Sequence, residues 1–253
     1  MTGARPASDG RPAHIVWDWN GTLLDDNEAV LSAVNAVCAS FGRPALTMAE
    51  WRAAFFRPLD RCYERLLGQP LTAADWGRID RHYHHTYAGL LPEVRLAAGV
   101  PEALHTWSAG GGTQSLLSMW FHDDLVDLVD RLGLTGHFAL VDGLRQDVGG
   151  GSKAEYLDRH LAALRLPPAD VVLIGDVVDD AVAARSVGAG CVLVSTGVAA
   201  RAVLVETGWP VADSVAAALA VVTGGRPDPG PGGVRGHGPA APGRQRGSRA
   251  RCP

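Results

Sequence analysis

Residues 14–26 read HIVWDWNGTLLDD and combine a short apolar run with a turn and several acids. The apolar run over residues 14–17 ends at Asp18, and the Asn20-Gly21 dipeptide that follows is typical of a turn. This order predicts a buried strand with the Asp18 carboxylate at its carboxyl end. A carboxylate in that position can act as a nucleophile. The same pattern also fits an ordinary turn in which Asp18 caps neighbouring backbone groups.

Beyond this stretch, apolar runs alternate with segments of helical periodicity. We expect strands at residues 115–118, 138–141, 171–174 and 191–194, and helices at residues 101–109, 123–132, 153–164, 179–187 and 214–222. This alternation predicts a doubly wound α/β fold with a parallel sheet. Ligands bind beyond the carboxyl ends of such strands, and Asp18, Asp176 and Ser118 lie at three of them.

Residues 27–95 break the alternation, because their apolar residues recur at helical spacing and no strand is evident. The expected domains are a flexible arm at 1–13, an α/β core at 14–25 and 97–223, a helical insertion at 26–96 and a disordered tail at 224–253. The tail is rich in Gly, Pro and Arg, with six Arg against one acid, Asp228. It contains too little apolar surface to offset the entropy of folding.

The composition suits a soluble globular protein, with 253 residues, 47% of them hydrophobic and 20% charged. The net charge of −4 offers no general case for binding nucleic acid. No apolar run is long enough to span a bilayer, and residues 1–12 lack the apolar stretch of a signal peptide. The four scattered cysteines are expected to be reduced thiols, so we expect a cytoplasmic protein with no membrane partner.

Two further groups of residues suggest chemistry at the strand ends. Residues 175–180 read GDVVDD, and carboxylates so close together persist most easily near a cation, so Asp176 is placed to bind Mg²⁺ with Asp18. Asp179 also suits the N-cap of the next helix. Lys153, the only lysine of the chain, opens a predicted helix and could neutralise a phosphoryl group. The alternatives are a surface lysine and, for Ser118, an ordinary strand-end serine.

Taken in order, these residues resemble the four motifs of the haloacid dehalogenase (HAD)-like hydrolase superfamily. The motifs are residues 18–22 (DWNGT), Ser118, Lys153 and residues 175–180. The long gap between Asp18 and Ser118 leaves room for a helical cap, as in the subgroup of phosphoglycolate phosphatases and β-phosphoglucomutases. The resemblance covers about residues 14–222 and implies a Rossmann-like HAD core with an inserted α-helical cap.

The resemblance also implies a role for each motif residue. The chain would be a Mg²⁺-dependent phosphatase that forms an aspartyl-phosphate at Asp18 with a small phosphorylated metabolite. Asp18, the backbone carbonyl of Asn20 and Asp176 would bind the metal. The phosphate would be held by Gly21, Thr22, Ser118 and Lys153. Asp180, with Asp179 as the alternative, would orient Lys153 or a metal-bound water.

Asn20 departs from the pattern, because phosphatases of this family usually carry at this catalytic position an Asp that protonates the leaving oxygen. An amide cannot exchange a proton, and losing such help typically costs about 10²–10⁴-fold in rate. The substrate could have a good leaving group, such as an acyl phosphate, or His122, Asp26 or a cap residue could supply the proton. Alternatively the chain is a weak or non-catalytic phosphate binder, or a dehalogenase-type C–X hydrolase, which would need no Mg²⁺.

In the cap, Arg57 and Arg61 are candidates for binding a second anionic group of the substrate. Trp51, Phe55 and Phe56 are candidates for the apolar walls of the pocket. The alternative is a helical core with solvated arginines.

Overall fold

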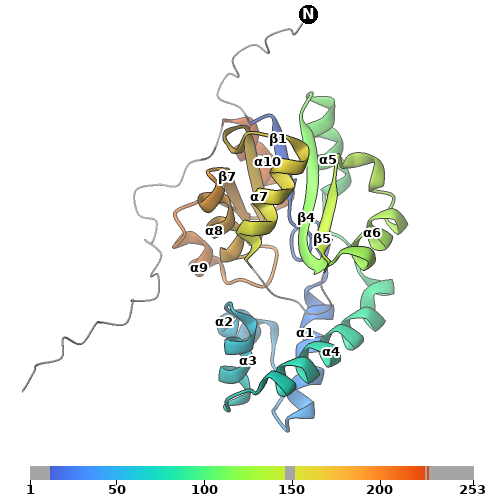
Figure 1. Ribbon diagram of the computed structural model, residues 1–253, viewed down its shortest axis with the longest axis vertical. Coiled ribbons are helices and arrows are strands. Elements are labelled where there is room, and N and C mark those ends of the chain that lie inside the picture. Colours follow the sequence, from blue (N-terminus) through green and yellow to red (C-terminus); the bar gives the residue numbers. More distant parts are fainter. Residues whose placement is uncertain (1–11, 146–151, 226, 228–253) are drawn as a thin grey trace, which may run out of the picture.

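The computed structural model describes residues 12–145, 152–225 and 227, which form an α/β unit and a separate group of helices (Figure 1). The predicted arm at residues 1–13 and tail at residues 224–253 lie almost wholly outside the described residues. Cys38, Cys62 and Cys191 are buried free thiols, whereas Cys252 lies outside the described part. Among the described residues, no helix combines the length and the apolar character needed to cross a membrane.

A six-stranded parallel sheet lies at the centre of the α/β unit, in the order β5-β4-β1-β6-β7-β8. Its strands are β1 (His14–Trp17), β4 (Thr113–Phe121), β5 (Val141–Leu144), β6 (Val171–Gly175), β7 (Gly190–Val194) and β8 (Val211–Ala212). Every residue of β1, β6 and β7 is buried, as expected for central strands covered on both faces.

Six helices cover the two faces of the sheet (Figure 1). They are α5 (Val100–Ala109), α6 (His122–Arg131), α7 (Lys153–Leu164), α8 (Val178–Val187), α9 (Arg201–Val205) and α10 (Val215–Thr223). Ile15 and Trp17 of β1 pack in one core with α5, α6 and α10, whereas Val16 packs in a second core with α7, α8 and α9. This alternation along one strand confirms the predicted doubly wound α/β fold.

Four further helices form the cap, which is a separate group beyond one edge of the α/β unit (Figure 1). They are α1 (Asn27–Ser40), α2 (Met48–Ala54), α3 (Leu59–Leu67) and α4 (Ala73–Leu90). Reciprocal capping boxes begin α2, with Thr47 and Glu50, and α4, with Thr72 and Asp75. Two short strands, β2 (Leu24–Asp25) and β3 (Arg95–Leu96), pair antiparallel where the chain enters and leaves the cap.

Three sequence expectations about strands were wrong. The strand expected at residues 138–141 is β5 at Val141–Leu144, because a 3₁₀ turn over Thr135–His137 delays its start. Ser118 does not end its strand, since β4 continues to Phe121, although the pairing with β5 shifts register between Leu117 and Phe121. The expectation of no strand within residues 27–95 missed β3, whose two residues are too few for a recognisable alternation.

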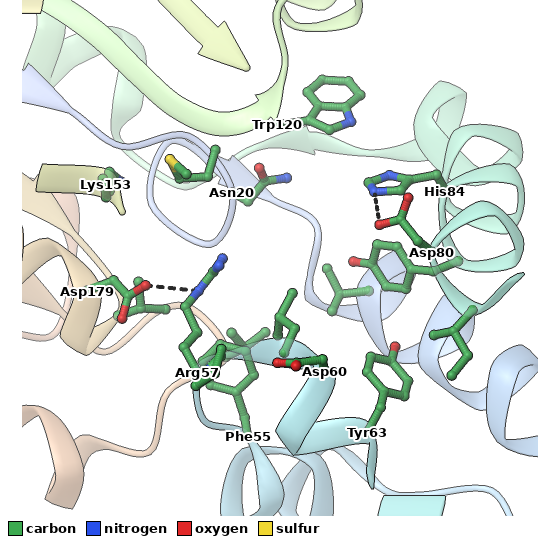
Figure 2. Close-up of a pocket in the computed structure, with 18 of the residues that line it drawn as sticks. Asn20, Phe55, Arg57, Asp60, Tyr63, Asp80, His84, Trp120, Lys153 and Asp179 are labelled. Atoms are coloured by element: carbon green, nitrogen blue, oxygen red, sulfur yellow. Dashed lines mark ion pairs between the residues drawn. The ribbon is translucent and has the colours of Figure 1, made fainter. Parts of the chain in front are cut away.

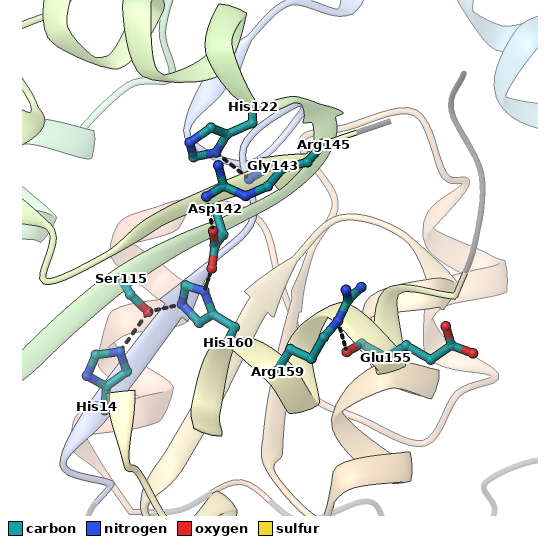
Figure 3. Close-up of polar contacts among 9 residues, drawn as sticks. All are labelled: His14, Ser115, His122, Asp142, Gly143, Arg145, Glu155, Arg159 and His160. Atoms are coloured by element: carbon teal, nitrogen blue, oxygen red, sulfur yellow. Dashed lines mark hydrogen bonds and ion pairs between the residues drawn. The ribbon is translucent and has the colours of Figure 1, made fainter. Parts of the chain in front are cut away.

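A buried polar chain ties the sheet to α7 (Figure 3). The ring of His14 on β1 contacts the Ser115 hydroxyl on β4 at 2.8 Å, and the His160 ring on α7 contacts the same hydroxyl at 2.7 Å. The other ring nitrogen of His160 lies 2.9 Å from a carboxylate oxygen of Asp142 on β5. His14, Ser115 and His160 are each at most 1% exposed, so these contacts replace the water that the polar groups lose on folding.

Candidate functional site

Adjacent parallel strands bring the predicted acids to one edge of the sheet. Trp17 of β1 lies opposite Ile174 of β6, and the Asp18 N–H donates to the Ile174 carbonyl at 2.8 Å. Asp18 and Asp176 therefore leave the sheet side by side. Together with Asp180 on α8, they each offer a carboxylate oxygen within 4.8 Å of the others. All three are buried, and the Asp180 side chain is fully so.

Lys153 joins this cluster from the first turn of α7. The Ser152 hydroxyl accepts from the Ala154 N–H at 3.3 Å and caps the helix at the point that positions the lysine. The Lys153 side chain is 3% exposed, and its ammonium forms ion pairs with the carboxylates of Asp18 and Asp180. Burial lowers the pKa of Lys153, but these carboxylates outweigh burial and raise it overall, so the ammonium stays charged.

The carboxylates are held together at an electrostatic cost. Burial raises the pKa of Asp18 to about 6, with Lys153 opposing the rise and Asp180 adding to it. Burial and the charges of Asp18 and Asp180 raise the pKa of Asp176 well above its ordinary value. Acids that repel one another in a buried place favour a bound cation. Oxygen ligands suit a hard cation, so Asp18 and Asp176, which both line the cavity described below, fit Mg²⁺, whereas Asp180 does not line it and pairs with Lys153.

Two glycines allow backbone loops to approach Asp176. Gly21 has φ 69°, and a Cβ there would lie 2.7 Å from Asp176 Oδ2. Gly197, in the loop after β7, has no room for a side chain, since a Cβ would lie 1.7 Å from the same oxygen. The next residue, Val198, donates its N–H to Asp176 Oδ2 at 3.0 Å. The loops after β1, β6 and β7 thus meet around one carboxylate.

Asn20 is bonded to a second buried acid. Its amide nitrogen donates to Asp26 Oδ2 at 2.7 Å and to the Tyr87 hydroxyl of α4 at 2.8 Å. The Tyr87 hydroxyl donates to the same Asp26 oxygen at 2.7 Å, and the Gly21 N–H donates to the other at 2.9 Å. Burial raises the pKa of Asp26, although these donors oppose the rise. Asp26 therefore supplies a carboxyl group next to Asn20, the residue that stands where phosphatases of the family usually carry an Asp.

A cavity of about 850 Å³ opens between this edge of the sheet and the cap (Figure 2). Most of the predicted site residues line it, namely Asp18, Asn20, Gly21, Ser118, Lys153, Asp176 and Asp179. Thr22 and Asp180 do not line it and are fully buried. The Thr22 hydroxyl has no hydrogen-bond partner among the described residues. Asp180 pairs with the Lys153 ammonium from the buried side, away from the cavity. The Ser118 hydroxyl accepts from the Trp120 N–H at 3.1 Å.

Asp179 contacts the cap instead of the lysine. Its carboxylate pairs with Arg57 at 3.3 Å, whereas Asp180 accepts the Val177 N–H at 3.1 Å and so caps α8. The expectation that Asp179 is the N-cap was wrong, because α8 begins at Val178 and its N-cap residue is Val177. Asp180 lies at the third position of the helix and accepts the N–H of that N-cap residue. Arg52 of α2 adds a second contact between cap and core, donating to the Gly197 carbonyl at 3.1 Å.

The other sequence candidates divide into those that face the cavity and those that do not. Trp51, Phe55, Arg57 and Asp26 line it. Arg61 instead donates to Glu64 at 2.6 Å, and the Phe56 ring lies under the Arg65 guanidinium at 4.4 Å. His122 accepts the Gly143 N–H at 3.2 Å and is not among the cavity-lining residues, so of the two named candidates for proton transfer only Asp26 faces the cavity.

Sequence reasoning missed the contribution of α4 and β4 to the cavity walls. Asp80, Tyr83, His84 and Tyr87 of α4 and Trp120 of β4 line the cavity. The sequence spacing does indicate that these α4 residues lie together, because Asp80 and His84, and likewise Tyr83 and Tyr87, are four residues apart and so share a helix face. Nothing in the sequence indicated which face would meet the core.

Comparisons with known proteins agree with this geometry. The family model described as "Haloacid dehalogenase-like hydrolase" matches residues 15–194. A phosphoglycolate phosphatase of Caulobacter vibrioides is 30% identical over 73% of this chain and 80% of its own. A 5'-nucleotidase of Pseudomonas aeruginosa is 25% identical over 74% of this chain and 84% of its own. A haloacid dehalogenase-like hydrolase of Streptococcus pneumoniae superimposes with a TM-score of 0.71 at 20% identity, covering 83% of this chain and 98% of that one.

Proposed function

Because this chain belongs to the haloacid dehalogenase-like hydrolases, we propose that it is a Mg²⁺-dependent phosphatase that uses Asp18 as its nucleophile on a small organic phosphate. The observation that carries the proposal is the position of Lys153. Its ammonium lies between Asp18 and Asp180, with Asp176 beside them, at the end of a cavity large enough for a substrate. Relatives named phosphoglycolate phosphatase and 5'-nucleotidase support a phosphate ester as the substrate class.

The reaction takes place in two steps. A carboxylate oxygen of Asp18 forms a bond to phosphorus as the ester P–O bond breaks, and the leaving alcohol oxygen takes up a proton. Water then hydrolyses the acyl phosphate, which releases inorganic phosphate and regenerates Asp18. Lys153 stabilises the charge of the phosphoryl oxygens and keeps Asp18 ionised. Asp180 holds the ammonium in place, because it is fully buried behind the lysine.

The predicted metal site consists of Asp18, Asp176 and the backbone carbonyl of Asn20. When bound, Mg²⁺ supplies positive charge that offsets repulsion between the carboxylates and the phosphate, and it orients in-line attack. Gly21 and Ser118 line the cavity, which supports their proposed roles in binding phosphate oxygens. Thr22 is fully buried and does not line the cavity, so the predicted direct contact of its side chain with phosphate was wrong.

Asn20 determines the choice of test substrate. An amide cannot protonate a leaving oxygen, so substrates with poor leaving groups depend on another proton source, whereas p-nitrophenyl phosphate has a leaving group that needs none. We expect Mg²⁺-dependent release of p-nitrophenol by the wild-type enzyme. The Asp18→Asn variant should lose at least about 10³-fold in kcat, as expected when the nucleophile is removed.

Two controls separate this function from the alternatives. Asp158→Asn removes an exposed acid of α7 outside the cavity and should leave turnover unchanged. If the wild-type chain bound phosphate but hydrolysed no activated phosphate ester, it would be a non-catalytic phosphate binder. Release of halide from a haloacid without Mg²⁺ would instead identify a dehalogenase.

A further inference from the structure

Residues 196–198 form a short loop after β7 that contacts both the cap and the predicted site. They belong to none of the four sequence motifs. Gly197 is buried, whereas Thr196 and Val198 are partly exposed, and Val198 lines the cavity. Each of the three makes a hydrogen bond with a residue at least 22 positions away in the sequence. We call residues 196–198 the bridging loop.

On its core side, the bridging loop holds groups at the predicted metal site. The Thr196 hydroxyl donates to the Gly21 carbonyl at 2.7 Å. The Val198 N–H donates to Asp176 Oδ2 at 3.0 Å. Asp176 is a predicted metal ligand, and Gly21 follows Asn20, whose carbonyl is another. Groups that bond to metal ligands orient them, and losing such a partner typically lowers metal affinity by about 10–100-fold.

On its other side, the bridging loop is held by the cap. The Asn27 amide donates to the Thr196 carbonyl at 2.7 Å, and Arg52 Nε donates to the Gly197 carbonyl at 3.1 Å. Asn27 opens α1 and Arg52 lies in α2, so both donors come from cap helices. The carbonyl groups of the loop therefore bind the cap, while its hydroxyl and N–H donors bind the core.

A single peptide unit joins the cap to the Asp176 carboxylate. The Gly197 carbonyl accepts from Arg52, and the N–H of the next residue donates to Asp176. These two groups belong to one trans peptide bond, so they point in opposite directions within a rigid plane. A charged donor on the carbonyl also polarises the unit and strengthens its N–H as a donor. A movement of Arg52 with the cap would therefore change how Asp176 is held.

We propose that this peptide unit couples the position of the cap to the affinity of the metal site. With the cap in the observed position, Arg52 fixes the unit, and the Val198 N–H orients the Asp176 carboxylate for the cation. Thr196 holds the neighbouring Gly21 carbonyl in the same way. Neither Arg52 nor Thr196 lines the cavity, so both are positioning residues. The inference rests on the proposed Mg²⁺-dependent function and adds that the cap, which carries no predicted ligand, affects metal binding.

Calorimetric titration of the protein with MgCl₂, without substrate, tests the coupling. We expect Arg52→Met to raise the Kd for Mg²⁺ at least about fivefold, because the new side chain has a similar length but cannot donate to the loop. Arg81→Met removes an exposed arginine of α4 outside the cavity and should leave the Kd unchanged. A Kd for Arg52→Met equal to that of wild type would overturn the inference, and so would a wild-type protein that binds no Mg²⁺.

Thr196 allows a second test that includes a conservative rescue. Thr196→Val removes the hydroxyl with little change of shape and should raise the Kd for Mg²⁺ at least about fivefold, whereas Thr196→Ser keeps the donor and should bind Mg²⁺ as wild type does. Equal Kd values for these two variants would contradict the positioning role of the hydroxyl. The Tm without Mg²⁺ identifies a variant whose fold is damaged. If Thr196→Val does not fold, Arg52→Met still decides the question, because the Arg52 side chain is partly exposed.

Activity separates this inference from the proposed function. With p-nitrophenyl phosphate, Arg52→Met should need at least about fivefold more Mg²⁺ for half-maximal activity, while kcat at saturating Mg²⁺ changes little. If the wild-type enzyme hydrolyses this ester with Mg²⁺ but Arg52→Met has the same Mg²⁺ dependence, only the coupling is wrong. If the wild-type protein binds Mg²⁺ but hydrolyses no phosphate ester, the phosphatase proposal is wrong, and the Kd values decide the coupling by themselves.

Discussion

Asn20 and Asp26 form an amide–carboxylate pair in which the amide nitrogen lies 2.7 Å from the carboxylate oxygen. Sequence alone suggests that Asn20→Asp would restore the missing acid. The structure shows that the new carboxylate would lie against the buried Asp26, so the two acids would repel each other. A useful exchange must therefore keep one amide and one acid in the pair.

We predict that the double variant Asn20→Asp/Asp26→Asn hydrolyses an alkyl phosphate at least about tenfold faster than wild type, because an acid then stands two residues after the nucleophile Asp18 and lines the cavity there. The single variant Asn20→Asp should gain less and should melt at a lower temperature. Steady-state kinetics with glycerol phosphate and thermal melts of all three proteins measure this. Equal gains for the single and double variants would mean that Asp26 does not oppose an acid at position 20.

The surroundings of Asn20 show which part of the site could be predicted from the sequence and which part could not. Asp18, Lys153 and Asp176 could be predicted to meet, because each opens or ends a secondary-structure element and parallel strands place their carboxyl ends together. The contact of Asn20 with Tyr87 joins residues 67 positions apart and depends on how α4 packs over the core. Periodicity identifies a helix and its apolar face, but it does not fix the angle and height at which that helix lies.

Burial determines which strands can be recognised from the sequence. The central strands β1, β6 and β7 were predicted to within about a residue, because they are continuous apolar runs. The edge strand β5 was misplaced, since Asp142 and Gly143 within it are residues typical of loops. The sequence did not predict β8 or the β2–β3 pair, because two-residue strands carry no periodic pattern.

The buried polar chain from His14 to Asp142 makes stability depend on pH. Burial, followed by the charge of His160, lowers the pKa of His14 from 6.5 to about 4. The folded state therefore binds fewer protons than the unfolded state between these values, so the free energy of unfolding falls as the pH drops from about 6.5 to about 4. The loss due to this residue is roughly 3 kcal/mol.

We predict that His14→Gln removes this part of the pH dependence. Urea unfolding of wild type and variant at several pH values between 4 and 7 measures it, and the difference between the two curves cancels the contribution of the buried acids near Asp18. The variant should be less stable than wild type at pH 7, where the hydrogen bonds of His14 are intact, and the gap should narrow toward pH 4. A gap that stays constant with pH would show that His14 does not titrate in this range.

The loops that follow three strands and the first turn of α7 converge on one charged cluster. A cation that binds only the folded protein raises the free energy of unfolding, by about 2.7 kcal/mol at a concentration 100 times its Kd. For a chain of this size we expect Mg²⁺ to raise Tm by about 5 °C or more.

The Asp176→Asn variant should lose most of this rise, because it removes a predicted ligand without changing the shape of the side chain. Differential scanning fluorimetry with Mg²⁺, with K⁺ and with a chelator measures the effect, and Asp158→Asn serves as the control that keeps the full response. An unchanged rise in Asp176→Asn would place the Mg²⁺ elsewhere in the protein.

The paired strands β2 and β3 join the cap to the core at a single point, where Leu24 lies opposite Leu96 and Asp25 opposite Arg95. The entire helical cap is thus an insertion whose two ends are paired with each other in the β2–β3 ribbon. Any other insert whose two ends meet at strand spacing could be grafted there without altering the register of the six-stranded sheet. The junction therefore makes substrate preference exchangeable as a module, while the residues that carry out the chemistry stay in the scaffold.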